Sequence, residues 1–445
     1  MASSHTSPPR CQWFSRLSAP LDKRSGRRLS VLFFGALLAS GLRTITSWIR
    51  AADLTKEYRR CYHTVAAAGR HPDEIAGRLL ADVVAPLLPA DGRVTLALDD
   101  TPTERFGPKV QGAGKHHNPT PGPVGSPFLY GHVWVVLGLL MAHPSWGAIA
   151  LPLLARLYIR RKDLDKVAAA DRPPFRTKLE LGVELVRWAV GELGRMGRTT
   201  VWVVADGAYA KAPFLKEMAR LGVTVVSRLR KDAALRSEPP ARVPGRRGRP
   251  RVYGEQRIVL AKRAGQQRGW TTGTFQLYGE QTTKRYKTFV ATWRPVGGPI
   301  RVVLVREEKS WRAYFSTDVT ATAGDILTRV ADRFSLETTF RDVKEVVGAG
   351  QQQARRLPVN IGAFHVCLWT FAMTEAWAWK APGEALTGHR VWSPWDDPSR
   401  RPSHADKRRA WQRDLLRMEF QAVLRAGHTD AEKEAALDRL LDLAV

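Results

Sequence analysis

Cysteine is scarce in this chain, and so is negative charge. The 445 residues include 3 Cys (Cys11, Cys61 and Cys367), which lie far apart and lack metal-ligand spacing. This scarcity excludes a disulfide-stapled scaffold and a zinc finger, and it fits a reducing compartment. There are 42 Asp and Glu against 70 Lys and Arg, a formal net charge of +28. Such an excess of cations is typical of proteins that neutralise phosphates rather than of ordinary metabolic enzymes.

Clean transmembrane or signal segments are also lacking. Hydrophobic residues make up 44% of the chain and charged residues 25%, which excludes wholesale disorder. Residues 26–41 carry paired arginines and an apolar run like an export signal, but the run begins late and an amphipathic segment continues it. Residues 133–159 are long enough to span a bilayer, yet His143, Pro144 and Pro152 interrupt them. We therefore expect a buried strand followed by a helix there, and no membrane association.

Changes in composition divide the chain into six expected segments. They are 1–25, a disordered basic N-terminus; 26–90, a helical and DNA-binding region; 91–229, the first part of an α/β core; 230–318, a basic β-rich insertion; 319–380, the second part of the core; and 381–445, a helical C-terminal tail.

The helical region has the form of a helix-turn-helix. Helices are expected over 29–40 and 44–52, with a turn at Gly41. Arg43 and Arg50 would then face DNA. A small helical bundle with a basic surface explains the same pattern equally well.

From Val94 onward, strand and helix patterns alternate. Apolar runs at 94–98, 130–139, 199–205 and 222–228 indicate buried strands, and the spacing of 178–196 indicates a helix between them. This order is typical of an α/β layer, with a mixed and mostly parallel sheet flanked by helices.

Carboxylates follow two of the expected strands. Asp99 and Asp100 end one strand, and Asp206 ends another. Carboxyl ends of parallel strands share one edge of a sheet, so these groups should lie close together. Neighbouring carboxylates repel unless a cation lies between them, and a hard divalent cation suits oxygen ligands. In a basic protein this favours phosphodiester chemistry with paired metals, although a single strand-end Asp is more often a helix N-cap.

A third carboxylate lies on a strongly periodic helix. Residues Leu336, Phe340, Val343 and Val347 make a core-facing stripe. At 100° per residue, Arg333, Glu337 and Lys344 fall within about 40° of one another beside this stripe. Taken alone, Arg333 and Glu337 would be a surface ion pair.

The combination resembles the bacterial insertion-sequence DDE transposases, the cut-and-paste group of DDE superfamily endonucleases named for Tyr-x2-Arg-x3-Glu-x6-Lys. Arg333, Glu337 and Lys344 match that spacing, and Val330 stands at the Tyr position. The sequence LDDT at 98–101 is similar to the group's first-strand Asp-x-Thr, which selects Asp99 over Asp100. The sequence ADGAY at 205–209 is similar to its second-strand motif.

The resemblance implies a ribonuclease-H-like core that binds two Mg²⁺ ions, with Mn²⁺ as a substitute, through Asp99, Asp206 and Glu337. Asp100 is the alternative to Asp99. It also implies that Arg333 and Lys344 grip DNA phosphates near the bond that is cut.

The basic insertion carries a second DNA-binding signal. Residues 227–270 hold many cations, and 244–250 read PGRRGRP. An extended segment of this kind places arginines in a narrow minor groove or forms a solvated loop. The arginines in question are Arg246, Arg247, Arg249 and Arg251. Trp270 and Trp293 are expected to be buried in a hairpin or to stack on a flipped base.

Three histidines, His116, His117 and His132, occupy the loop 106–132. Adjacent residues point in different directions, so we favour DNA contact or loop structure over a zinc site.

The leading hypothesis is a DNA transposase that cuts at the terminal inverted repeats of its element and joins them to target DNA. The expected partners are double-stranded DNA and a second copy of the chain in a synaptic homodimer, in the cytoplasm near the nucleoid. The alternative is a catalytically inactive or repurposed DNA-binding protein derived from such a transposase.

Overall fold

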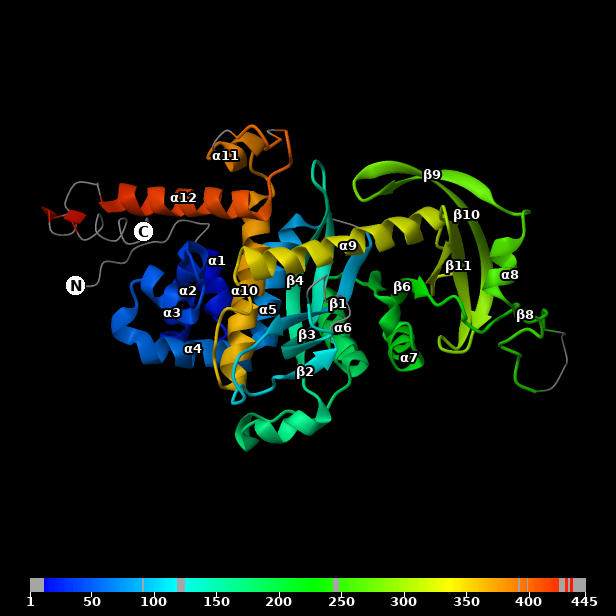
Figure 1. Cartoon of the computed structure of the whole chain (residues 1–445), viewed down its shortest axis with the longest axis horizontal. Helices are drawn as coiled ribbons and strands as arrows, with labels where there is room; N and C mark the ends of the chain where they lie inside the picture. Colours follow the sequence, from blue (N-terminus) through cyan, green and yellow to red (C-terminus); the bar gives the residue numbers. More distant parts are fainter. Residues whose placement is uncertain are drawn as a thin grey trace.

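The protein is elongated, with helices at one end, a sheet in the middle and long β-hairpins at the other end (Figure 1). A computed structural model describes residues 12–89, 92–117, 125–242, 248–390, 393–397, 399–423, 429–430 and 433–434. Its longer helices are α1 (Gln12–Ser18), α2 (Lys23–Leu38), α3 (Ile45–Ala51), α4 (Tyr58–Arg70), α5 (Pro72–Leu79), α6 (Lys178–Arg195), α7 (Ala212–Arg220), α8 (Leu260–Gly265), α9 (Ala323–Glu345), α10 (Leu357–Ala378), α11 (Gly383–Thr387) and α12 (His404–Val423).

The described strands all belong to one sheet. In chain order they are β1 (Val94–Glu104), β2 (Gly114–His117), β3 (Phe128–His143), β4 (Gly147–Tyr158), β5 (Val201–Ala205), β6 (Thr224–Leu229), β7 (Leu235–Arg236), β8 (Arg257–Ile258), β9 (Thr271–Leu277), β10 (Glu280–Trp293), β11 (Gly298–Arg306) and β12 (Trp311–Ser316). Their order is β2-β3-β1-β5-β6-β12-β11-β10-β7-β8, with β4 beside β3 and β9 beside β10. The α/β class with a mixed, helix-flanked sheet is confirmed.

The sheet is mixed but not mostly parallel, so that part of the prediction is wrong. Only β1–β5 and β5–β6 are parallel pairs among the described strands. The remaining pairs are antiparallel, including β1–β3, β3–β4, β10–β11 and β12–β6. Short turns such as the one between β3 and β4 force antiparallel neighbours, because a parallel pair needs a long crossover.

The expected helix after the strand at 133–159 is also wrong, because Gly147–Tyr158 is strand β4. A short turn at 144–146 leads into Gly147, whose φ of 73° suits the turn. Pro152, which argued against a strand, pairs with Gly138 beside an irregularity in the register. A bulge is one of the few places where a sheet accepts proline.

Helices α9 and α6 flank the part of the sheet around β1 and β5 on opposite faces. On β5, Trp202 and Val204 share a hydrophobic cluster with Ile326 and Leu327 of α9. The alternate residues, such as Val203, pack into the main core, where α6 also lies. Since side chains alternate along a strand, even-numbered residues of β5 face α9. This alternation decides which charged side chains meet beyond the strand ends.

The N-terminal helices pack onto the body of the protein. Disorder over 1–25 is contradicted for the described part, because α1 forms and buries Phe14 and Leu17, and Asp22 caps α2. Helices α2 and α3 touch closely at Gly35, where a Cβ would lie 2.1 Å from the carbonyl oxygen of Trp48. The apolar run at 26–41 is therefore the core-facing surface of a folded helix.

Helix α10 is the central helix of the helical end. It is long and apolar enough to cross a membrane, alone in this among the described helices, but 94% of its most apolar window is buried inside the protein. The buried carboxylate of Glu375 on α10 accepts hydrogen bonds from His404 and Lys407 of α12, at 2.7 and 2.5 Å. Burial alone would raise the pKa of Glu375, but these two partners hold it at about 2. The ion pair docks α12 onto α10.

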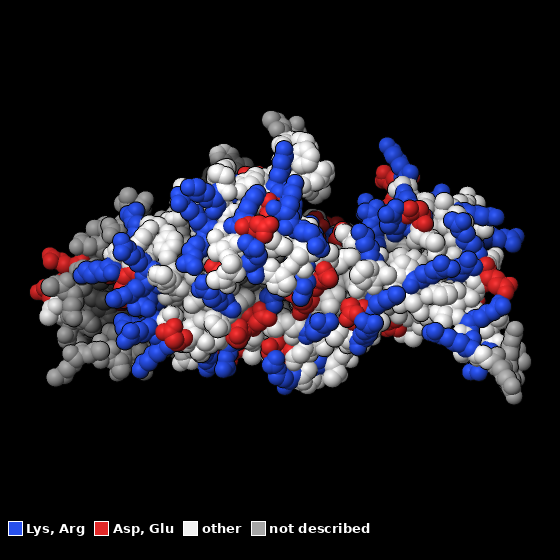
Figure 2. All heavy atoms as spheres, turned by 90° about the horizontal axis from the view of Figure 1, so that it is seen from below, with Lys and Arg blue, Asp and Glu red and all other residues white. Residues whose placement is uncertain are grey.

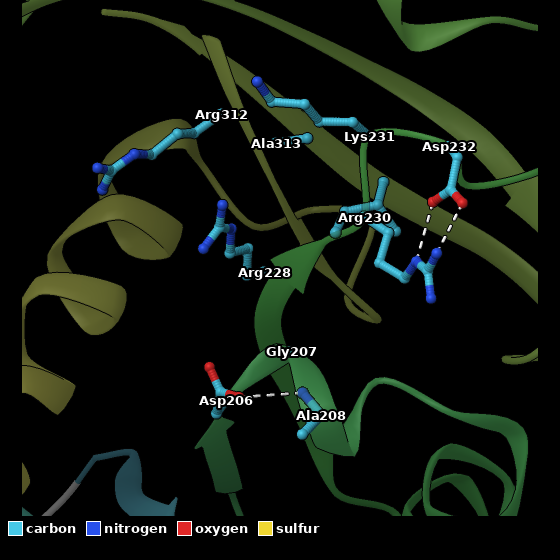
Figure 3. A pocket seen from close by; sticks show the side chains of 10 residues that line it. Asp206, Gly207, Ala208, Arg228, Arg230, Lys231, Asp232, Arg312 and Ala313 are labelled. Carbon is cyan, nitrogen blue, oxygen red and sulfur yellow. Dashed lines mark hydrogen bonds and ion pairs between the residues drawn. The ribbon is translucent and has the colours of Figure 1, made fainter. Parts of the chain in front are cut away.

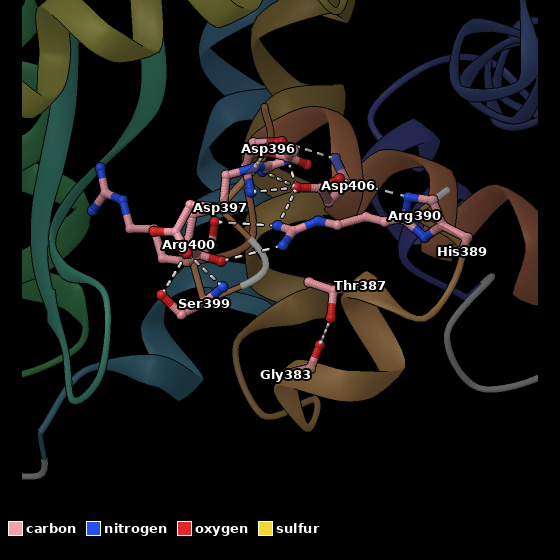
Figure 4. Close-up of polar contacts among 11 residues, drawn as sticks. Gly383, Thr387, His389, Arg390, Asp396, Asp397, Ser399, Arg400 and Asp406 are labelled. Carbon is pink, nitrogen blue, oxygen red and sulfur yellow. Dashed lines mark hydrogen bonds and ion pairs between the residues drawn. The ribbon is translucent and has the colours of Figure 1, made fainter. Parts of the chain in front are cut away.

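A second polar cluster connects α11 to α12 (Figure 4). Asp406 accepts hydrogen bonds from Arg390 at 2.7 Å, Arg400 at 2.8 Å and Ser403 at 2.7 Å. These contacts hold the loop after α11 against the start of α12.

We expect Gly362→Ala to destabilise the fold by about 1–3 kcal/mol, because overpacking moves backbone. Helices α4 and α10 cross so closely that a Cβ on Gly362 would lie 1.9 Å from the carbonyl oxygen of Val65. Gly191→Ala on α6 is the matched control, since nothing lies within 4 Å of its added Cβ. It should raise stability by roughly 0.5–1 kcal/mol. Thermal unfolding of both variants measures this, and equal melting temperatures would contradict the close crossing.

Candidate active site

The carboxylates of β1 lie where its parallel pairing ends. Leu98 is opposite Ala205 of β5, and this is the last pair of the two strands. Asp99 and Asp206 each follow that pair, at one edge of the β1–β5 ladder. Strand β1 itself continues to Glu104, beyond the expected strand end, because β3 pairs with it antiparallel as far as Gly131.

Asp99 meets helix α9 through Arg333. The guanidinium of Arg333 donates to Asp99 Oδ2 through Nη1 and to Glu337 Oε1 through Nη2, the latter at 3.0 Å. The side chains of Arg333 and Asp99 are 16% and 18% exposed, whereas that of Glu337 is 45% exposed. One buried cation is thus shared by a strand carboxylate and a helix carboxylate.

The protonation of Asp99 is perturbed by its surroundings. Burial raises the pKa of Asp99 to about 6, and Arg333 opposes that rise. The neighbouring carboxylates of Asp100 and Asp206 add to it. The three negative groups therefore lie close enough to influence one another, and a positive charge among them is favourable.

Asp100 points to the opposite face of the sheet from Asp99. It accepts a hydrogen bond from Lys178 Nζ at 2.6 Å, and Lys178 is the first residue of α6. No sequence pattern predicts Lys178 at this position, because the two residues are 78 positions apart in the chain. Glu337 is on α9, so Asp99, and not Asp100, shares its face.

Asp206 begins a short 3-10 turn, Gly207–Tyr209. Its carboxylate accepts a hydrogen bond from the backbone N–H of Ala208 at 3.1 Å, as an N-cap does. Tyr209 behind it is buried in the core. The other carboxylate oxygen of Asp206 is directed toward a cavity in which Arg228 also lies (Figure 3). The capping role and a metal-binding role are therefore compatible.

Lys344 lies further along α9 than Glu337. It is half-buried, and burial lowers its pKa. Val330, at the signature Tyr position, lines a second cavity of about 230 Å³ together with Tyr278 and Tyr314.

Residues 16–295 match the family described as DDE superfamily endonuclease. The chain belongs to the DDE superfamily endonuclease family. The match includes Asp99 and Asp206, and Glu337 follows it in the chain. No significant match exists among curated proteins. Membership of the family implies a metal-dependent nuclease.

The donor chemistry of this DDE endonuclease fits a divalent metal. Asp99, Asp206 and Glu337 offer carboxylate oxygens, which hard cations prefer, and burial, with Asp100 and Asp206 nearby, raises the pKa of Asp99. Within the described ranges, however, no three His, Cys, Asp or Glu side chains converge as a ready-made metal cluster. Arg333 supplies the positive charge between Asp99 and Glu337. A metal would share or replace that contact.

The predicted DNA-binding arginines lie in different surroundings. Arg50 on α3 is exposed, whereas Arg43 is half-buried and donates to the carbonyl of Glu345 at the end of α9. Arg249 is exposed, and Arg251 is exposed but paired with Glu255. Arg246 and Arg247 lie outside the described residues. Lysine and arginine side chains are spread over the face seen in Figure 2.

The predicted histidine and tryptophan residues have structural contacts. His132 is buried, where Arg105 Nε donates to its Nδ1 at 3.0 Å, and burial lowers its pKa to about 3. Burial also lowers the pKa of His116 to about 4, and His117 packs against Phe128. Trp293 is buried against Phe315, and Lys287 lies over the ring of Trp270. Trp293 is thus buried in the hairpin, the first of the two alternatives, whereas Trp270 is half-buried.

We expect Arg333→Gln to increase the stabilisation that Mn²⁺ gives this endonuclease. The variant loses the cation shared by Asp99 and Glu337, so a divalent ion gains more by neutralising them. Arg329→Gln is the control, since Arg329 pairs with Asp332 one turn earlier on α9. The measurement is the melting temperature with and without MnCl₂. A Mn²⁺ shift no larger in Arg333→Gln than in wild type would contradict competition between Arg333 and the metal.

Proposed function

We propose that this DDE endonuclease is the transposase of an insertion sequence. It would cut phosphodiester bonds at the ends of its element and transfer those ends into target DNA. The observation that supports this best is the arrangement of Asp99 and Asp206 at the edge of two parallel strands, with Glu337 attached to Asp99 through Arg333. The net charge of +28 supports DNA as the substrate.

In the proposed site, Asp99, Asp206 and Glu337 would hold two Mg²⁺ ions, with Mn²⁺ as a substitute. Ions held by these residues would supply a lowered pKa for an attacking water or terminal hydroxyl and stabilisation of the leaving 3′ oxygen. Arg333 orients Asp99 and Glu337, and it would donate to a phosphate once a metal shares or replaces those contacts. Lys344, on the same helix, would add a point charge to the phosphate backbone.

The fold and the basic surface support DNA as the partner of this endonuclease. The order of β4, β3, β1, β5 and β6 is consistent with a ribonuclease-H-like core. The N-terminal helices with Arg50 and the basic segment with Arg249 and Arg251 would bind double-stranded DNA, both the terminal inverted repeats and the target. We propose a homodimer in the synaptic complex and a location in the cytoplasm at the nucleoid.

Cleavage should depend on a divalent metal. Purified protein is expected to nick a duplex carrying one of the inverted repeats that flank the gene in MgCl₂ or MnCl₂, and not in EDTA. CaCl₂ should support binding without cutting, because catalysis needs tighter geometry than charge neutralisation does. Gel analysis of labelled strands measures this. Undiminished cleavage in EDTA would overturn the two-metal proposal.

Asp99→Asn, Asp206→Asn and Glu337→Gln should each lower cleavage by at least about 100-fold, since even supporting residues of metal sites contribute that much. Binding of the end duplex should change little, because these groups neutralise no phosphate. Asp100→Asn is the matched control on the adjacent residue, and its effect should be milder. Loss of cutting in Asp100→Asn alone would reassign the first metal ligand. Normal binding with no cutting by wild type would favour the alternative, an inactive DNA-binding derivative.

A further inference from the structure

A basic cavity opens beside Asp206, where β6 leaves the core and β12 returns to it. Its volume is about 410 Å³, within the range of ligand-binding pockets. Its lining residues are Asp206, Gly207, Ala208, Arg228, Leu229, Arg230, Lys231, Asp232, Arg312 and Ala313. None of the cations among them was singled out by motif or spacing in the sequence.

The arginines of this cavity share one face of the sheet. Val226 of β6 and Tyr314 of β12 both belong to the hydrophobic cluster under α9. By alternation, Arg228 and Arg312 point to that same face. Tyr314 is directly opposite Arg228 in the ladder, so Arg312 is the diagonal neighbour of Arg228. The backbone pairing thus starts the two arginine side chains from diagonal positions on one face of the sheet, and both line the cavity.

The charges around the cavity do not cancel. Arg230 is paired with Asp232 at 2.7 Å, and this pair lies apart from the others in Figure 3. In the described part of the chain, Arg228, Lys231 and Arg312 form no ion pair with a carboxylate, and Lys231 lies over the ring of Trp311 at 5.1 Å. Asp206 is hydrogen-bonded only to the N–H of Ala208 among its described contacts.

Adjacent like charges are unfavourable unless a ligand of opposite sign joins them. An anion is therefore favourable on the arginine side of the cavity, and a cation is favourable beside the carboxylate of Asp206 on its other side. A phosphodiester accompanied by a divalent cation satisfies both sides at once. Arginine forks match phosphate oxygens in particular, because they donate two parallel hydrogen bonds.

We propose that this cavity binds a backbone phosphate of the DNA strand next to the bond cut at Asp206, through Arg228 and Arg312, with Lys231 at the rim. The proposal rests on DNA being the substrate, as proposed above. It adds a phosphate site formed by β6 and β12, distinct from the contacts of Arg333 and Lys344 on α9.

The test compares Arg228→Gln/Arg312→Gln with the control Arg230→Gln, using the fluorescent end duplex in CaCl₂. Each lost phosphate contact makes the slope of log affinity against log salt shallower by about 0.9. The slope of the double variant should therefore be shallower than that of wild type by about two units, and the slope of the control should be almost unchanged. Arg228→Lys/Arg312→Lys keeps both charges and should keep most of the slope. The three substituted side chains are exposed, and melting temperatures check that each variant is folded.

Position is tested with single neutral methylphosphonates placed along the strand near the cut. One position close to the cut should weaken wild-type binding and have no further effect in the glutamine double variant. If wild type cuts but the double variant keeps its slope and its methylphosphonate response, the cavity proposal is overturned and the transposase proposal stands. If wild type never cuts but the slope falls only in the double variant, the phosphate site stands and the nuclease function fails.

Discussion

The shared contact of Arg333 holds the candidate site together. Arg333, which lies 234 residues after Asp99 in the chain, joins that carboxylate to Glu337 one turn further along α9. Without a cation between them, a buried carboxylate and a second one nearby would be costly. The guanidinium thus fixes the position of α9 on β1 and at the same time occupies the place where positive charge is needed. Under the proposed function, the stability of the free protein and its affinity for a metal would depend on the same three side chains.

Because side chains alternate along a strand, neighbouring charged residues of β1 lie on opposite faces of the sheet. Asp99 faces α9 and Arg333, while Asp100 faces α6 and Lys178. Two adjacent aspartates therefore have different roles for a purely geometric reason. The same rule places Asp206, Arg228 and Arg312 toward α9, although they come from three different strand ends. A single face of the sheet carries both the carboxylates and two arginines that form no ion pair within 4 Å in the described part of the chain.

The sequence allowed the carboxylates to be found, because a periodic helix stripe and apolar runs ending in Asp are local patterns. It could not reveal Lys178 or Arg312, whose roles depend on pairings between distant segments. The expected helix at Gly147–Tyr158 was wrong, because Pro152 argues against a strand unless a bulge accommodates it. Likewise, the polar N-terminus concealed Phe14 and Leu17, which are buried only because α2 and α12 are folded nearby.

The β-rich segment is continuous with the core sheet, so the hairpins and the carboxylates belong to one hydrogen-bonded sheet. Strand β12 pairs with β6 from Ala313 to Ser316, so the hairpins β9–β11 extend the same sheet that carries Asp206. Backbone hydrogen bonds fix Arg312 next to Arg228, with no flexible linker between them. DNA held by the hairpins would therefore be placed relative to the carboxylates by the sheet itself. Positioning of the substrate would then follow from the register of β6 and β12, since a shift of one residue would turn Arg312 to the opposite face.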